Sequence, residues 1–160
     1  MDSVSEQRLS EVHPELSLRV HELADTLEVA EISIRITQGL RTWAEQDELY
    51  AQGRTAPGNI VTNARGGYSG HNLGYAVDFV VMDAALPDWN ASDPQWQAVL
   101  KEALKHGLAE GAAWRSFPDM PHLYLQELSA TPDDEMRYIY QEQGMQALWD
   151  SWNIPRWQMT

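Results

Sequence analysis

The first thirty residues carry apolar side chains at every third or fourth position. This spacing places them on one face of a helix. The apolar positions are Leu9, Val12, Leu16, Val20, Leu23 and Leu27. Pro14 interrupts the series, and proline inside a helix removes a backbone hydrogen bond and clashes with the preceding turn. The pattern therefore predicts two consecutive amphipathic helices.

The period of the apolar positions then changes to two. Ile32, Ile34 and Ile36 alternate with polar residues, which is typical of a half-buried strand. Residues 42–52 predict a short helix, in which Thr42 is the N-cap and Glu45 completes a capping box.

Glycine interrupts regular structure over residues 53–74, which hold six glycines and one proline. A loop of this length in a compact domain is usually functional. We expect a strand at 75–82 after it, and then a loop at 87–94. A helix is predicted at 94–106, short strands at 113–117 and 122–126, and a last helix at 132–143.

This order of helices and strands predicts the α+β class. Nothing in the sequence marks an internal repeat or a linker, so we expect one domain over 1–160, with a helical region at 1–30 and a tryptophan-rich tail at 133–160 packed on it. Trp149 and Trp152 are expected to pack that tail onto the core. A stacking surface for glycan sugars is the alternative.

Composition narrows the classes of function. The 160 residues carry 11 Lys and Arg against 24 Asp and Glu, a formal net charge of -13, and no cysteine. Disulfides and thiolate metal sites are excluded, so a metal would need His, Asp or Glu ligands. The acidity argues against nucleic acid and anionic lipid as partners, because these require clustered basic residues.

The start of the chain lacks the basic and apolar regions of a secretory signal, and no apolar stretch is long enough to cross a bilayer. We therefore expect a protein that is made in the cytoplasm and does not insert into membranes. A site of action outside the membrane would require a separate route of release.

Two segments carry metal-ligating residues. His71 and Asp78 are seven residues apart, which in a helix would separate them by about 10.5 Å along the axis, too far to share one ion. If the chain turns at the glycines and enters a strand, His71 can fold back over the face that carries Asp78. Farther on, Pro118 and Pro121 force a bend that can bring Asp119 and His122 into the same cleft.

Together the segments offer His71, Asp78 and His122 as three ligands, with Asp119 as a free carboxylate. Three protein ligands and an open fourth position are typical of catalytic zinc, which activates water and polarises a carbonyl. A carboxylate beside that water can move its proton. A His2Asp site also suits other divalent ions.

The sequence at this point resembles a known family. The spacing SxHxxGxAxD, followed about forty residues later by DxPH, is similar to that of the VanY-like zinc D,D-carboxypeptidases and L-alanyl-D-glutamate endopeptidases of peptidoglycan, a group that includes many phage endolysins. The resemblance extends over residues 37–79 and 114–122, through the segments Gly39-Leu40-Arg41-Thr42, Glu45-Gln46, Leu49 to Thr55 and Pro57-Gly58.

The resemblance implies a small α+β domain with an antiparallel sheet carrying the zinc, as in hedgehog-type D,D-peptidases. It implies that His71, Asp78 and His122 bind Zn²⁺ and that Asp119 is the catalytic acid and base. It also implies that Arg41 faces the substrate or the developing oxyanion and that Ser69 lines the substrate site. From the residues alone, Arg41 could instead form a surface ion pair with Glu45, and Asp119 and Ser69 could be turn residues.

The implied function is cleavage of peptidoglycan stem peptides, in the first place as an L-alanyl-D-glutamate endopeptidase of the endolysin type. Such a protein would act as a monomer on the cell wall or in the periplasm, reached through a holin-type pore in the phage case. The alternatives are a D,D-carboxypeptidase that removes terminal D-Ala and needs a cationic pocket, for which Arg54 or Arg65 is available, a toxin with the same chemistry, and a zinc-stabilised wall-binding module without turnover.

Overall fold

The structure is a computed structural model that describes residues 1–115 and 118–157. Its helices are α1 (Ser3–Leu9), α2 (Pro14–Val29), α3 (Trp43–Ala51), α4 (Pro94–Lys105), α5 (Asp134–Gln143) and α6 (Met145–Ser151), with short 3-10 helices η1 (Gly70–Leu73) and η2 (Gly111–Ala113). Its strands are β1 (Ser33–Gln38), β2 (Ala76–Asp83), β3 (Leu86–Asp88), β4 (Leu108–Glu110) and β5 (His122–Leu125). The predicted α+β class is confirmed.

The strands form one antiparallel sheet in the order β1-β2-β5-β4, and β3 pairs with the far end of β2. The pairing of β2 with β5 sets Asp78 directly opposite His122, although they are 44 residues apart in the sequence. Opposed residues of an antiparallel pair have Cβ atoms about 4.5–5.5 Å apart. The register of the sheet therefore brings these two side chains together.

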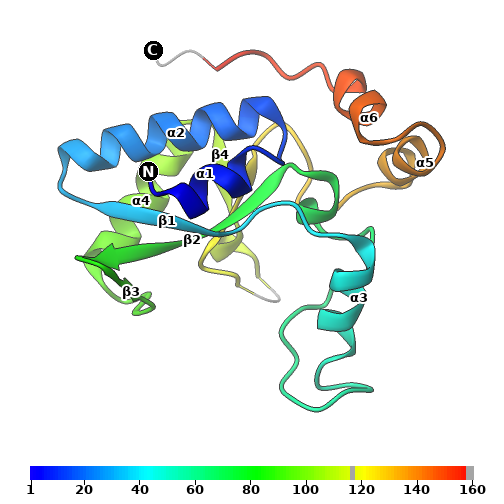
Figure 1. Cartoon of the computed structure of the whole chain (residues 1–160), viewed down its shortest axis with the longest axis horizontal. Coiled ribbons are helices and arrows are strands. Elements are labelled where there is room, and N and C mark those ends of the chain that lie inside the picture. The colour runs from blue at the N-terminus through cyan, green and yellow to red at the C-terminus, as the bar shows by residue number, and fades with distance from the viewer. Residues whose placement is uncertain (116–117, 158–160) are drawn as a thin grey trace.

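The hydrophobic core lies between the sheet and helices α2 and α4. Figure 1 shows α2 lying along the sheet, whereas α3 and the loop after it project beyond the sheet. All six apolar positions of the N-terminal stripe are buried, as the sequence predicted. Phe79 of β2 stacks on Trp96 of α4 with ring centroids 4.9 Å apart. Because side chains alternate along a strand, Asp78 faces the opposite side.

Several element boundaries follow from local chemistry, as predicted. Pro14 is the first residue of α2, where its missing N–H costs nothing. The Thr42 hydroxyl accepts from the backbone N–H of Glu45, and the Glu45 carboxylate accepts from that of Thr42, which completes the capping box of α3. Gly107 takes the left-handed conformation, with φ at 69°, after the end of α4.

The prediction for the segment before His122 was wrong. The strand lies at β4 rather than at 113–117, and it is followed by η2. Residues 116–117 lie outside the described residues. The expected loop at 87–94 also begins inside β3. Both strands have only three residues, too few to show an alternating pattern.

The tryptophans of the C-terminal segment pack against the body of the protein. The Trp149 indole donates to the Leu73 carbonyl at 2.8 Å, and Trp152 meets the Tyr75 ring edge-on at 5.6 Å. The His13 ring packs against both indoles. These contacts favour packing over a sugar-stacking surface. The boundaries of the regions 1–30 and 133–160 stay predictions. Among the described helices, none is both long and apolar enough to cross a membrane.

A buried arginine connects distant parts of the chain. The fully buried Arg19 guanidinium of α2 donates two hydrogen bonds of 2.9 Å to Glu127, one of 3.1 Å to Glu15 and one of 2.8 Å to the Gly107 carbonyl. It also lies over the Trp157 ring, 4.9 Å from its centroid. Helix α2, the turn after α4 and the C-terminal segment therefore meet at one cation.

We expect Arg19→Met to lower the free energy of unfolding by about 3 kcal/mol, because both carboxylates lose their buried partner. This is the lower end of the usual range, since Glu127 is 24% exposed and can be rehydrated. Urea unfolding measures the change. Arg156→Met, at an exposed arginine, is the matched control and should cost less than about 0.5 kcal/mol. Equal losses in the two variants would contradict the role of Arg19.

Candidate metal centre and active-site cleft

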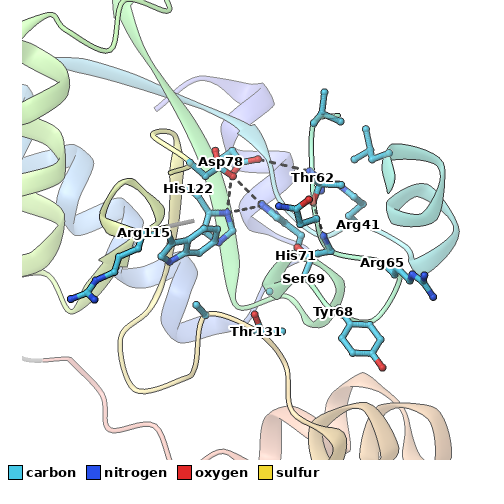
Figure 2. A pocket seen from close by; sticks show the side chains of 18 residues that line it. Arg41, Thr62, Arg65, Tyr68, Ser69, His71, Asp78, Arg115, His122 and Thr131 are labelled. Atoms are coloured by element: carbon cyan, nitrogen blue, oxygen red, sulfur yellow. Dashed lines mark hydrogen bonds and ion pairs between the residues drawn. The ribbon is translucent and has the colours of Figure 1, made fainter. Parts of the chain in front are cut away.

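A cleft of about 960 Å³ opens on the side of the sheet that carries Asp78. Figure 2 shows the side chains of β2, β5 and η1 meeting those of α3 and the following loop around it. Every site residue predicted from the sequence lines this cleft, namely Arg41, Ser69, His71, Asp78, Asp119 and His122. The fold thus gathers into one place residues that the chain spreads over 82 positions.

Three potential metal-ligand atoms converge in the cleft. The Oδ1 atom of Asp78 lies 3.1 Å from His71 Nε2 and 3.1 Å from His122 Nδ1, and the two ring nitrogens are 3.2 Å apart. Both histidines are 3% exposed, so water does not separate these atoms. The three residues form a cluster that could hold a metal ion.

The backbone fixes the ring orientation of His71. Its Nδ1 atom lies 2.9 Å from the Gly39 carbonyl, which can only accept, so Nδ1 carries the hydrogen and Nε2 presents its lone pair to the cluster. The short helix η1 that carries His71 ends at Gly74, with φ at 73°. A Cβ atom on Gly74 would lie 2.7 Å from the Trp149 ring, so only glycine fits this turn.

The cluster fits a tetrahedral metal ion. Zinc bonds of about 2.0–2.1 Å at tetrahedral angles place ligand atoms about 3.3 Å apart, close to the distances found here. His71 Nε2 and the Asp78 carboxylate both present lone pairs, and such atoms repel unless a cation or proton lies between them. Burial alone would raise the pKa of Asp78, but His71 and His122 hold it well below its usual range. Asp78 is therefore an anionic ligand.

A tight bend places Asp119 beside His122. The Gly111 carbonyl accepts from the backbone N–H groups of both Trp114 and Asp119, each at 3.0 Å. A Cβ on Gly111 would lie 2.8 Å from the Asp119 carbonyl and 2.9 Å from the His122 Cβ, so this close approach requires glycine. Burial, and then the nearby Asp78 carboxylate, raise the pKa of Asp119, although the histidines and Arg41 oppose this.

Arg41 directs its guanidinium into the cleft. Its Nη2 atom lies 3.8 Å from Asp78 Oδ2, and its backbone N–H donates to the His71 carbonyl at 3.0 Å. Burial lowers the pKa of Arg41, while Asp78, Glu45 and Asp119 raise it, and an arginine stays charged in any case. The alternative surface ion pair with Glu45 is not found, because that carboxylate caps α3 through Thr42. Ser69, half-buried, precedes η1.

The other arginines near the cleft are engaged elsewhere. Arg54 donates to the carbonyls of Tyr50 and Thr62 at 2.7 and 3.0 Å and to Asn63 at 2.9 Å. Arg65 lies over the Tyr50 ring, 5.0 Å from its centroid. In Figure 2, Arg65 and Arg115 point away from the three ligand side chains.

Two buried amides of the site were missed by the sequence analysis. Asn72 donates to the carbonyls of Arg41 and Thr42 at 2.9 and 3.2 Å, and it accepts from the Gly67 N–H at 3.0 Å. Gln46 bonds to the Arg41 side chain. The family resemblance included Gln46 but gave it no role, and a single polar residue in a short helix carries no other signal.

Comparisons with known proteins agree with this geometry. The sequence model of the VanY family, described as D-alanyl-D-alanine carboxypeptidase, matches residues 9–116. The peptidoglycan L-alanyl-D-glutamate endopeptidase CwlK of Bacillus subtilis is 40% identical over 126 residues, which span 71% of this chain and 73% of CwlK.

Solved structures share the fold. The L-Ala D-Glu endopeptidase ChiX of Serratia marcescens matches with a TM-score of 0.59 and 27% identity, over 78% of this chain and 88% of ChiX. A vancomycin-resistance D,D-pentapeptidase, VanY, solved as an E175A mutant with Zn(II), matches with a TM-score of 0.53 and 16% identity, over 84% of this chain and 80% of that chain. At this identity the second match bears on the fold alone.

We expect the chain to bind one zinc ion at the cluster. Free zinc at 100 times its dissociation constant should raise the free energy of unfolding by about 2.7 kcal/mol, because the ligands meet only in the folded state. Thermal unfolding with zinc and with a chelator tests this, alongside metal analysis of the protein. His122→Ala should lose both the ion and the stabilisation, whereas His21→Ala, outside the cleft, should keep them. A His122→Ala variant that binds zinc like the parent would contradict the site.

Proposed function

The chain belongs to the VanY D-alanyl-D-alanine carboxypeptidase family, and from this premise we propose that it is a zinc-dependent hydrolase that cuts the L-alanyl-D-glutamate bond of peptidoglycan stem peptides. The observation that carries the proposal is the convergence of His71, Asp78 and His122 in a cleft beside the half-buried Asp119. The 40% identity to CwlK, an endopeptidase for this bond, supports the choice of bond.

The ligand set suits catalytic zinc. His71, Asp78 and His122 would hold the ion through two nitrogens and one oxygen, which leaves the fourth tetrahedral position toward the cleft. When bound there, zinc supplies Lewis acidity that polarises the scissile carbonyl and lowers the pKa of a water molecule. The Gly39 carbonyl holds the His71 ring in the tautomer that this role requires.

Asp119 is the proposed acid and base. A raised pKa brings a carboxyl closer to the working pH, where it can both take and return a proton. In the proposed reaction, Asp119 takes a proton from the water that attacks the L-Ala carbonyl carbon. It then delivers the proton to the D-Glu nitrogen as the C–N bond breaks. The products are a new carboxylate and a new amine.

Arg41 is proposed to stabilise the charge that develops on the carbonyl oxygen. Its guanidinium carries N–H groups toward the cleft, and hydrogen bonds to a developing oxyanion are among the largest contributions to catalysis. Ser69, at the entrance to η1, is proposed to bind the substrate.

The arrangement of cations favours the endopeptidase over the D,D-carboxypeptidase. An enzyme that removes a terminal D-Ala must bind a free carboxylate next to the scissile bond. Arg54 and Arg65 were the candidates for that pocket, but Arg54 is bonded to main-chain carbonyls and Arg65 points away. We also propose that the protein acts as a monomer at the cell wall and that zinc is its working metal.

We expect digestion of purified peptidoglycan by the zinc-loaded protein to produce peptides with a new N-terminal D-Glu. Mass spectrometry of the products identifies them, and a chelated sample is the control. Loss of a single terminal D-Ala would instead assign the carboxypeptidase activity. Unchanged peptidoglycan, with zinc bound, would contradict the enzyme and support a wall-binding module.

We expect Asp119→Asn to lower kcat by about 10²- to 10⁴-fold, because an amide cannot carry the proton. Its zinc content and thermal midpoint should match those of the parent, since Asp119 is not a ligand. Asp134→Asn, at a fully exposed carboxylate of α5, is the matched control and should keep the parent kcat. Turnover by Asp119→Asn at the parent rate would rule out the proposed proton transfer.

A further inference from the structure

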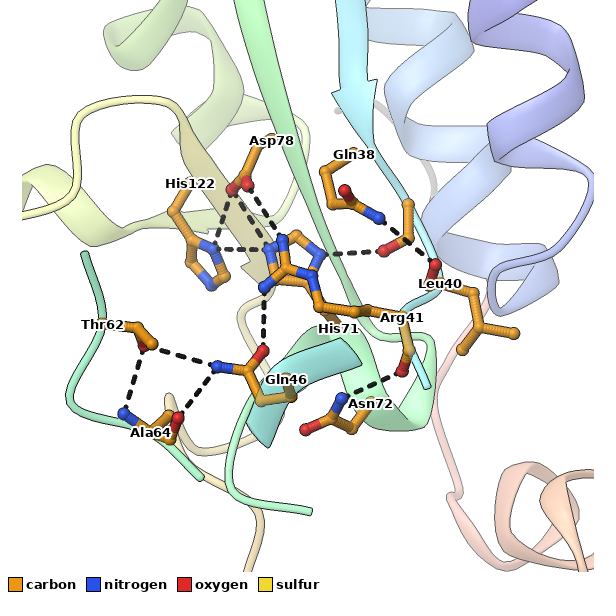
Figure 3. A network of polar contacts seen from close by, with 11 residues as sticks. Gln38, Leu40, Arg41, Gln46, Thr62, Ala64, His71, Asn72, Asp78 and His122 are labelled. Atoms are coloured by element: carbon orange, nitrogen blue, oxygen red, sulfur yellow. Dashed lines mark hydrogen bonds and ion pairs between the residues drawn. The ribbon is translucent and has the colours of Figure 1, made fainter. Parts of the chain in front are cut away.

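Gln46 lies at the centre of a polar network behind the cleft, which Figure 3 shows. Its side-chain oxygen accepts from Arg41 Nη1 at 2.8 Å, and its side-chain nitrogen donates to the Ala64 carbonyl at 2.9 Å and to the Thr62 hydroxyl at 3.4 Å. We propose that Gln46 is a positioning residue that fixes the Arg41 guanidinium and sets it by reference to the cleft-lining segment 62–64.

This inference rests on the proposed function, because it concerns how Arg41 meets the substrate.

The partners of Gln46 determine which way its amide points. The Ala64 carbonyl can only accept, so it must face the amide nitrogen. The Arg41 guanidinium can only donate, so it must face the amide oxygen. A flipped amide would lose both hydrogen bonds at once. Gln46 therefore has one orientation, and its oxygen marks a fixed point for Arg41.

Burial makes this orientation strict. Gln46 is 1% exposed, so water cannot replace a lost partner, and an unsatisfied buried amide is costly. The Thr62 hydroxyl also accepts from the Ala64 N–H at 3.1 Å, which folds the segment around the amide. The loop thus holds the glutamine, and the glutamine holds the arginine.

Arg41 needs such a hold because an anion lies close to it. Its Nη2 atom is 3.8 Å from Asp78 Oδ2, beyond hydrogen-bond distance but well within strong attraction at a buried site. A freely rotating guanidinium would close onto that carboxylate and compete with the metal for it. The Gln46 oxygen retains Nη1 without cancelling its charge, which leaves the other N–H groups for the substrate.

The kinetic test uses zinc-loaded full-length protein and a defined muropeptide. Gln46→Met keeps the length of the side chain but removes its hydrogen bonds, and we expect kcat to fall about tenfold while KM changes less than about twofold. In an Arg41→Met background the same change should lower kcat by less than about twofold, because Gln46 acts through Arg41. Gln46→Glu, which keeps an oxygen for Arg41, should recover most of the loss. Gln143→Met, at an exposed glutamine, is the matched control.

A second readout does not require turnover. In ¹⁵N NMR spectra the guanidinium signals of Arg41, assigned by their loss in Arg41→Met, should be resolved in the parent and broadened by rotation in Gln46→Met. Thermal unfolding and zinc content of each variant show whether it is folded and loaded.

The outcomes separate the inference from the function on which it rests. Losses that multiply in the double variant, or Arg41 signals that are identical in the parent and Gln46→Met, would overturn the positioning role. If the parent does not cleave the muropeptide, the proposed function fails. The NMR comparison then decides the positioning role alone, where broadening supports it and identical signals overturn it.

Discussion

Three ligand atoms held within 3.2 Å of one another are the constraint on which the rest of the structure depends. They come from η1, β2 and β5, so no single segment of the chain contains the site. The ligands can meet only after the sheet has paired and η1 has folded back over it. A cation bound among them stabilises that complete arrangement and nothing less, which links metal binding to folding.

Strand β2 separates the polar site from the hydrophobic core. Val77 and Phe79 face the core, whereas Asp78 between them faces the cleft, because side chains alternate along a strand. A slip of one residue in the pairing would turn the Asp78 carboxylate toward Trp96 and the core. The cost of burying that unpaired charge therefore fixes the register that the metal centre needs.

Local signals in the sequence predicted local structure well. The capping box at Thr42, the break at Pro14 and the alternation of Ile34 and Ile36 each depend on a few neighbouring residues. The family resemblance also selected the six residues that line the cleft. The register of Asp78 against His122 could not be read, since it is set by contacts between distant strands. The short strands β3 and β4 were missed because three residues show no period.

The buried amides were the hardest part to foresee, and they determine how the cleft uses its charge. Arg54 is held by carbonyls, Arg65 lies over an aromatic ring and Arg41 is held by Gln46, so each cation has a neutral partner. A carboxylate partner would fix the guanidinium equally well but would neutralise it. A chain with a net charge of -13 has many carboxylates available for such pairs. Neutral partners fix Arg41 in place while preserving its positive charge, and that charge is what a developing oxyanion requires.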